Sequence, residues 1–287
     1  MINRMHKDRL FNLLFGSESF KENTLSLYNA INGTDYSDPD LITFNTIQNF
    51  LYMGVNNDVS FIIADTLNIY EHQSTLSSNM PVRMLNYLTR LFETFISENE
   101  LSVFRENPIK LPAPKFIVFY NGEKDIEDEM IFSLSQHFDT DADIELNVRF
   151  LNINYGHNKK LMEKCEALND YSKLIYDIRQ NKKKGMDDIQ AIDNAIMELN
   201  NDSVIKPIIL KNKSEVRDMM YDEEFDRIHT ERLYKEMKED SWNAGKIEGK
   251  AEGIIEGTEL TLEKVRTSMR DSGISDDQIN IILSRVN

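Results

Sequence analysis

Asp58, Glu71 and Gln73 bring two carboxylates and one amide into a short stretch of the chain. Two carboxylates held close together suit a hard cation that prefers oxygen ligands, such as Mg²⁺ or Mn²⁺. A bound ion of this kind lowers the pKa of a coordinated water and stabilises negative charge on a phosphate. The three residues are therefore candidates for a catalytic metal site, which would suit hydrolysis of a phosphodiester without a covalent intermediate.

The residues between the two carboxylates predict a β-hairpin that would bring them onto one surface. Two apolar runs flank a turn at residues 65–66. With that turn, residue numbers that sum to about 131 face each other, which puts Asp58 opposite Gln73 and Ser60 opposite Glu71. Asp58 and Glu71 become diagonal neighbours about 7–8 Å apart, and Gln73 shares their face. The same spacing also fits solvent-facing residues of an ordinary edge hairpin, so spacing alone leaves both interpretations open.

Apolar periodicity predicts the elements that surround this hairpin. We expect helices over residues 7–32, 79–97 and 127–138, and strands over residues 41–53, 116–120 and 144–154. The segment 116–120 is apolar throughout, which is typical of a strand buried on both faces and predicts a central position. The predicted fold class is α/β, with a mixed central sheet flanked by helices and followed by an all-helical C-terminal region.

The mixture of strands and helices ends near residue 157, and the rest of the chain has only helical patterns. We therefore expect three parts. Residues 1–157 are predicted to form the α/β core, residues 158–242 a helical region, and residues 243–287 a helical tail.

Four glycines recur every four residues in the tail, at Gly245, Gly249, Gly253 and Gly257. An isolated glycine costs a helix about 1 kcal/mol relative to alanine, so the repeat indicates either close helix–helix contact or a loose linker. Two short helices follow, over about residues 259–271 and 275–286, and resemble a helix-turn-helix weakly. We expect this tail to serve assembly into a homo-oligomer, and DNA binding by its last two helices is the alternative.

The net charge of −16 argues against a protein that coats DNA through a global positive field. A local basic stretch can still guide a nucleic-acid strand if it lies on the correct face. Lysines 159, 160 and 164, and then 182, 183 and 184, are the candidates for such a stretch. Lysine runs of this kind are also common on solvated helix surfaces, so both interpretations stay open.

The single cysteine, Cys165, cannot form an internal disulfide or a thiolate metal cluster, which fits a reducing compartment. No window approaches the roughly 20 apolar residues of a membrane span, and the apolar part of the N-terminus is too short for a signal peptide. We therefore expect a cytoplasmic protein that has no membrane partner. No motif for an organic cofactor was found.

Three segments carry a family resemblance: NNDVSFIIADTLNIYEHQSTLSSNMPVRMLNYLTRLFE, LPAPKFIVFYNG and VRFLNINYGHN. They contain, in order, an Asn-Asp pair, Glu-x-Gln, Arg-x-x-x-Tyr and a proline before an apolar strand. In these motifs the chain resembles the Rpn family of recombination-promoting nucleases and transposases, within the PD-(D/E)XK nuclease superfamily. The likeness runs from about Phe11 to the glycine-rich tail.

The resemblance implies roles for the three residues of the hairpin. Asp58 would be the metal-binding aspartate at the start of the second strand. Glu71 and Gln73 would be a Glu-x-Gln version of the superfamily's E-x-K element on the third strand. Gln73 departs from the superfamily pattern, because an amide can orient water but cannot supply the positive charge of lysine.

Three further residues enter through the same resemblance. Glu22, in the first helix, would approach the metal as an acidic residue does in many superfamily members, although it also fits a helix surface. Arg83 and Tyr87 are four residues apart on one helix face and would contact phosphate and substrate. They also fit a purely structural role through hydrogen bonds and packing.

The function implied by the resemblance is that of a Mg²⁺-dependent endodeoxyribonuclease of low sequence specificity that acts in DNA recombination or in mobile elements. Its partner would be DNA. The alternative is a nuclease-fold DNA-binding or assembly protein that has lost cleavage, which the acidic charge and Gln73 both favour.

Overall fold

The structure is a computed structural model that describes residues 9–44, 59–211, 260–273 and 275–283, together with single positions 216, 246 and 257. The chain divides into two compact units, residues 1–227 and residues 228–287. Asp58 and three of the spaced glycines, 245, 249 and 253, lie outside the described residues. In the part of the chain that is described, no helix is long and apolar enough to cross a membrane.

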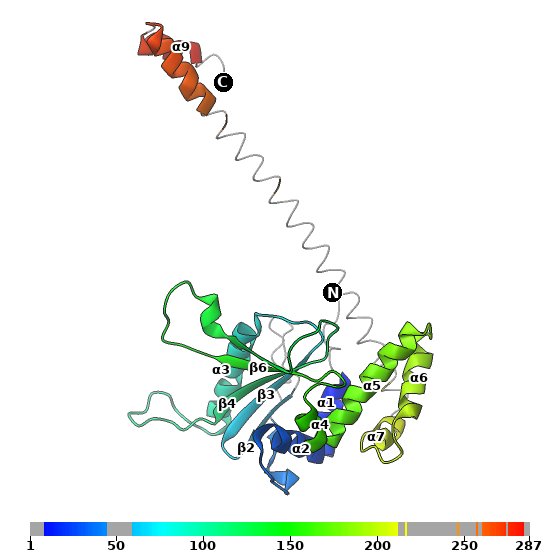
Figure 1. Ribbon diagram of the computed structural model, residues 1–287. Helices are drawn as coiled ribbons and strands as arrows, with labels where there is room; N and C mark the ends of the chain where they lie inside the picture. The colour runs from blue at the N-terminus through cyan, green and yellow to red at the C-terminus, as the bar shows by residue number, and fades with distance from the viewer. Residues whose placement is uncertain are drawn as a thin grey trace. The chain divides into compact units, whose positions relative to one another are not determined.

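Six strands form one mixed sheet in the order β1-β2-β3-β4-β6-β5 (Figure 1). Their bounds are β1 Thr43–Phe44, β2 Val59–Ile63, β3 Thr66–Gln73, β4 Ala113–Tyr120, β5 Glu129–Ser133 and β6 Asn147–Asn152. β4 pairs in parallel with β3 on one side and with β6 on the other, whereas β1, β2 and β5 add antiparallel pairs at the two edges. The prediction of a central strand at residues 116–120 is confirmed.

Helices cover both faces of this sheet, so the α/β class is confirmed (Figure 1). The first unit contains α1 Arg9–Phe15, α2 Lys21–Asn32, α3 Met80–Glu98, α4 Lys159–Lys164, α5 Glu166–Lys183, α6 Asp188–Glu198 and α7 Lys206–Lys211. Short 3₁₀ turns occur at Glu18–Phe20, Pro39–Leu41 and Leu134–His137. The core on one face includes α3, and the core on the other face includes α1, α2 and α5.

The predicted helix over residues 7–32 is wrong in one respect, because it is broken into two helices at Gly16. The Ser17 side chain accepts a hydrogen bond from the Ser19 amide and starts a 3₁₀ turn. Thr24 donates to the Phe15 carbonyl at 2.7 Å, which satisfies a carbonyl at the end of α1. A β-carbon at Gly16 would lie 2.9 Å from Val59 Cγ2 and 3.0 Å from the Asn12 carbonyl oxygen, so this position disfavours a larger residue.

The predicted helix over residues 127–138 is also wrong, since its central part is strand β5. Met130 and Phe132 pack against the core while the alternate residues Glu129 and Ile131 are exposed, which is the pattern of a strand. Pairing with β6 decides the outcome, because it satisfies the backbone of this segment as part of the sheet.

The hairpin forms as predicted, but its register differs by two residues. Val59 pairs with Tyr70 and Ser60 pairs with Ile69, so Ser60 is not opposite Glu71. The chain turns at Ala64 and Asp65, whose φ values of 47° and 59° are the positive values that a type I′ turn requires. A shift of two residues leaves each side chain on its predicted face, whereas a shift of one would reverse every side chain.

The predicted boundary at residue 157 falls inside the first compact unit. Leu168, Tyr171 and Leu174 of α5 share one apolar core with Phe11 of α1 and Phe119 of β4. The helices after the sheet therefore complete one of its faces, and the predicted tail of residues 243–287 lies within the second unit.

Within the second unit, the pair of short helices predicted at the C-terminus is present in the described residues. A helix covers residues 260–271, and α9 covers Asp276–Leu283. Gly273, with a φ of 81°, lies between them, as the sequence predicted.

Ala64→Gly should raise the free energy of unfolding by about 0.5–1 kcal/mol. Alanine is strained by about 1–2 kcal/mol in the left-handed conformation, and the larger unfolded-state entropy of glycine offsets part of the gain. Urea unfolding measures this difference. The control is Ala30→Gly inside helix α2, where the same change should lower stability by about 1 kcal/mol. A loss of stability at Ala64 would contradict this turn.

Candidate functional site

The candidate site begins with Glu71, an acidic residue inside an apolar strand. Along β3, Leu67 and Ile69 point into the core beneath α3, so Glu71 and Gln73 face the same side. The Glu71 residue is only 2% exposed. A carboxylate at this depth is costly unless a cation and hydrogen-bond donors accompany it.

Both kinds of partner are present. The Arg83 guanidinium of α3 forms an ion pair with Glu71 Oε1, and Gln73 Nε2 donates to that same oxygen at 3.1 Å. Arg83 Nη2 also donates to the Tyr87 hydroxyl at 3.0 Å, one helical turn away. The structure therefore brings together four of the six predicted site residues, from one strand and one helix.

Of the other two predicted residues, Glu22 is not part of this group. Glu22 is exposed in the first turn of α2, and the buried residues of α2, such as Leu25 and Tyr28, pack on the opposite face of the sheet from Glu71. Asp58 lies outside the described residues, so its predicted place beside Glu71 stays a prediction.

His72 points to the opposite face from its two neighbours. It lies 3.0 Å from the hydroxyl of Tyr171 in α5 and stacks on the ring of Phe11 in α1. These contacts give His72 a packing role between the sheet and two helices.

The donor set agrees with a hard cation. Glu71 offers a carboxylate and Gln73 an amide oxygen, and Mg²⁺ often binds proteins through one or two carboxylates plus substrate phosphates. Among the described residues, no group of three or more His, Cys, Asp or Glu is placed to hold a metal ion. A metal at Glu71 would thus depend on Asp58 and on phosphate oxygens for its further ligands.

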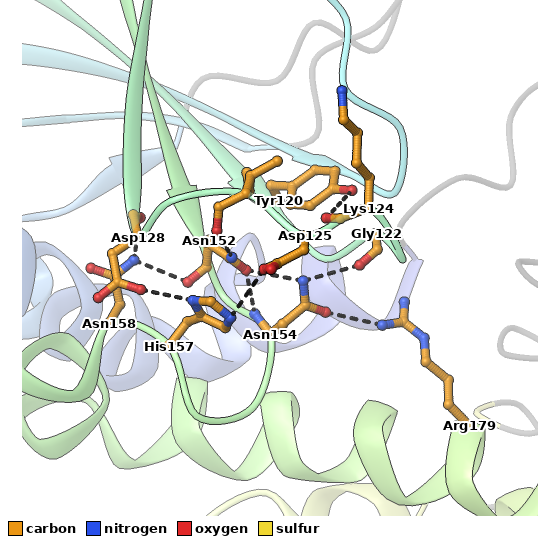
Figure 2. A network of polar contacts seen from close by, with 11 residues as sticks. Tyr120, Gly122, Lys124, Asp125, Asp128, Asn152, Asn154, His157, Asn158 and Arg179 are labelled. Atoms are coloured by element: carbon orange, nitrogen blue, oxygen red, sulfur yellow. Dashed lines mark hydrogen bonds and ion pairs between the residues drawn. The ribbon is translucent and has the colours of Figure 1, made fainter.

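A second polar cluster lies at the carboxyl ends of β4 and β6, and the sequence interpretation did not identify it (Figure 2). Asn158 Nδ2 donates to the carbonyl oxygens of Asp128 and Asn152, and His157 Nδ1 lies 2.8 Å from an Asp128 carboxylate oxygen. These contacts fasten the loop before β5 to the loop after β6. The recurrence of asparagine at the end of β6 and in the loop after it, at positions 152, 154 and 158, was the signal that could have indicated it.

The same cluster reaches the strand that carries Glu71. Asn154 donates to the Gly122 carbonyl at 3.0 Å, and Arg179 of α5 donates to Asn154 Oδ1 (Figure 2). Arg179 also donates to the Asn121 carbonyl. The Asn121 backbone amide in turn donates to the Gln73 backbone carbonyl at 2.9 Å. Helix α5 is thereby linked to the end of β3.

Close packing at Gly122 also fixes these strand ends. A β-carbon there would lie 2.1 Å from the carbonyl oxygen of Ser74, the residue after Gln73. Beside it, burial raises the pKa of Tyr120, and its hydroxyl donates to the Lys124 carbonyl at 3.0 Å. The turn after β4 is therefore held against the end of β3.

Cys165 takes no part in either cluster. It is fully buried between α4 and α5, and that burial raises the pKa of its thiol, which favours the neutral, unreactive form. Its role is packing.

Comparisons of the chain with family models, with curated proteins and with solved structures found no match.

Proposed function

We propose that this protein is a metal-dependent DNA endonuclease of low sequence specificity that hydrolyses phosphodiester bonds. The observation that supports it best is the convergence of Glu71, Gln73 and Arg83 beside a central parallel pair of strands. A mixed sheet flanked by helices is compatible with the nuclease core that the sequence resembles. A role in recombination or mobile elements rests on that resemblance alone.

In this proposal Glu71 and Asp58 hold the metal, which is Mg²⁺ or Mn²⁺. When bound, the ion supplies an activated water and stabilises charge on the scissile phosphate. Gln73 directs its amide nitrogen to Glu71, which leaves its carbonyl oxygen to accept a hydrogen bond from the attacking water.

Arg83 is the residue that could replace the lysine missing at position 73. Its guanidinium already lies against Glu71, and its bond to Tyr87 orients it from the next turn of α3. A guanidinium presents a planar set of donors that matches phosphate oxygens. In the proposed reaction Arg83 therefore stabilises negative charge on the phosphate, and Tyr87 positions Arg83.

The second candidate is a nuclease-fold protein that binds DNA or assembles without cutting. It is favoured by the neutral Gln73, by the net charge of −16, and by an ion pair that already neutralises Glu71. This candidate predicts metal-independent binding without cleavage.

Nicking of supercoiled plasmid should require Mg²⁺ and stop with EDTA. Asp58→Asn and Glu71→Gln should each lower the rate at least about a hundredfold, because each removes a charged ligand of the metal. Glu93→Gln, an equal change at an exposed position of α3, is the matched control and should keep wild-type activity.

Equal nicking by the wild type and all three variants would identify a contaminating nuclease and contradict the proposal. Binding of DNA with no Mg²⁺-dependent nicking by the wild type would favour the non-cleaving candidate instead.

Arg83→Gln should lower both cleavage and stability, whereas Arg83→Lys should keep part of each. The loss of stability should be roughly 2–4 kcal/mol, because the Glu71 carboxylate is left buried without its cation. Adding Glu71→Gln to Arg83→Gln should restore much of that stability without restoring cleavage. Urea unfolding and plasmid nicking measure the two effects, and Arg105→Gln, at an exposed position in the loop after α3, is the control.

If Arg83→Gln unfolds at the same urea concentration as the wild type, the ion pair does not contribute to stability. If it also nicks plasmid at the wild-type rate, Arg83 has no role in the proposed reaction.

A further inference from the structure

Two tyrosine rings lie together on the surface where the chain leaves the sheet. Tyr155 follows the end of β6, and Tyr176 comes from α5. Their ring centroids are 5.1 Å apart with an interplanar angle of 35°, yet the two residues remain 47% and 41% exposed. Rings with this exposure add little to the apolar core, and each keeps much of its surface open to solvent.

The segment that carries both rings is basic in an otherwise acidic chain. Residues 155–184 contain eight Lys and Arg against four Asp and Glu, a net +4, while the whole chain is −16. Lys173 Nζ lies 5.9 Å from the centre of the Tyr155 ring and pairs with Asp177. Lys159, Lys160 and Lys183 of the same segment are exposed.

Hydrogen bonds join this surface to the candidate site. Asn154, next to Tyr155, accepts a hydrogen bond from Arg179, which lies one helical turn beyond Tyr176. Arg179 also donates to the Asn121 backbone carbonyl, and the Asn121 backbone amide donates to the Gln73 backbone carbonyl. Three hydrogen bonds therefore lead from the tyrosine pair to the strand of Glu71.

We propose that Tyr155 and Tyr176 form a stacking platform for unpaired bases of single-stranded DNA, and that the basic segment around them binds its phosphates. Exposed aromatic faces within a positive surface are the combination that binds single strands without reading their sequence, since every base has a flat face that can stack. A duplex keeps its bases stacked inside and cannot use such a platform. The choice of DNA rests on the proposed function.

The test measures binding without cleavage. The full chain is titrated in EDTA against a fluorescein-labelled 20-nucleotide oligothymidylate and against a duplex of the same length, and anisotropy gives each Kd. We expect the single strand to bind more tightly than the duplex. Tyr155→Leu and Tyr176→Leu should each weaken single-strand binding about tenfold and leave duplex binding nearly unchanged, because leucine keeps apolar bulk but has no ring.

Tyr155→Phe and Tyr176→Phe should keep the wild-type Kd within about twofold, because stacking needs the ring and not the hydroxyl. Phe104→Leu is the matched control, since Phe104 is 95% exposed on a loop outside the basic segment, and it should bind as the wild type does. Thermal melts of all variants verify the fold.

Three results would each overturn the platform: no binding of the single strand by the wild type, an unchanged Kd in both leucine variants, or an equal loss in the phenylalanine variants. Each is measured in EDTA and leaves the result of the plasmid assay untouched, so failure of the platform and failure of the nuclease proposal are distinguishable.

Discussion

The pairing of Glu71 with Arg83 is the constraint on which the arrangement of strand and helix depends. Removing a carboxylate from water costs several kcal/mol, and Gln73 on the same strand supplies a hydrogen bond but no positive charge. The guanidinium must therefore come from the helix that covers this face. Helix α3 begins at Met80, and Pro81 is in its first turn, which places Arg83 one turn from the helix start, within reach of β3. Apolar packing alone would not require an arginine at this position of α3.

The carboxyl ends of the parallel strands are a second fixed region, and side-chain amides hold it together with the Arg179 guanidinium. Asn152 is fully buried and donates to the Ile126 carbonyl at 2.9 Å, so a side chain satisfies backbone that the sheet itself leaves unpaired. The near contact of Gly122 with Ser74 then sets the separation of β3 and β4 at the end where Gln73 lies. Side-chain amides suit this task because each both donates and accepts.

Much of this arrangement could be predicted because it follows from local pattern. The continuous apolar run of β4 predicted its central position, and the alternation along β3 put Glu71 and Gln73 on one face even though the predicted register was displaced by two residues. The spacing of Arg83 and Tyr87 put both on one face of a helix, and the structure joins them to each other. Moving the turn by one residue, from 65–66 to 64–65, changes the pairing register by two, so each side chain keeps its predicted face.

The rest depends on contacts between segments far apart in the chain, which local pattern does not contain. Strand β5 is fixed by its pairing with β6, although its own sequence suggested a helix. Nothing near Tyr171 indicates that it packs against Phe11 of the first helix, so local pattern does not reveal that one apolar core spans both sides of residue 157. The ion pair of Glu71 also depends on a distant segment. Spacing predicted two carboxylates for a metal, and only the folded chain shows that Arg83 of α3 already pairs with Glu71.

That ion pair has a consequence for the proposed chemistry. A metal can bind Glu71 only if it shares the carboxylate with Arg83 or displaces it, since both cations are drawn to the same group. A guanidinium displaced without a new partner would lose its charge-assisted hydrogen bonds, whereas a phosphate arriving with the metal offers it equivalent ones. Metal and nucleic acid should therefore each bind more tightly when the other is bound. The phosphate offers acceptors to the guanidinium that the metal displaces, and the metal releases that guanidinium from Glu71. The same pair that allows a charge inside the core would in this way restrict metal binding until substrate is present.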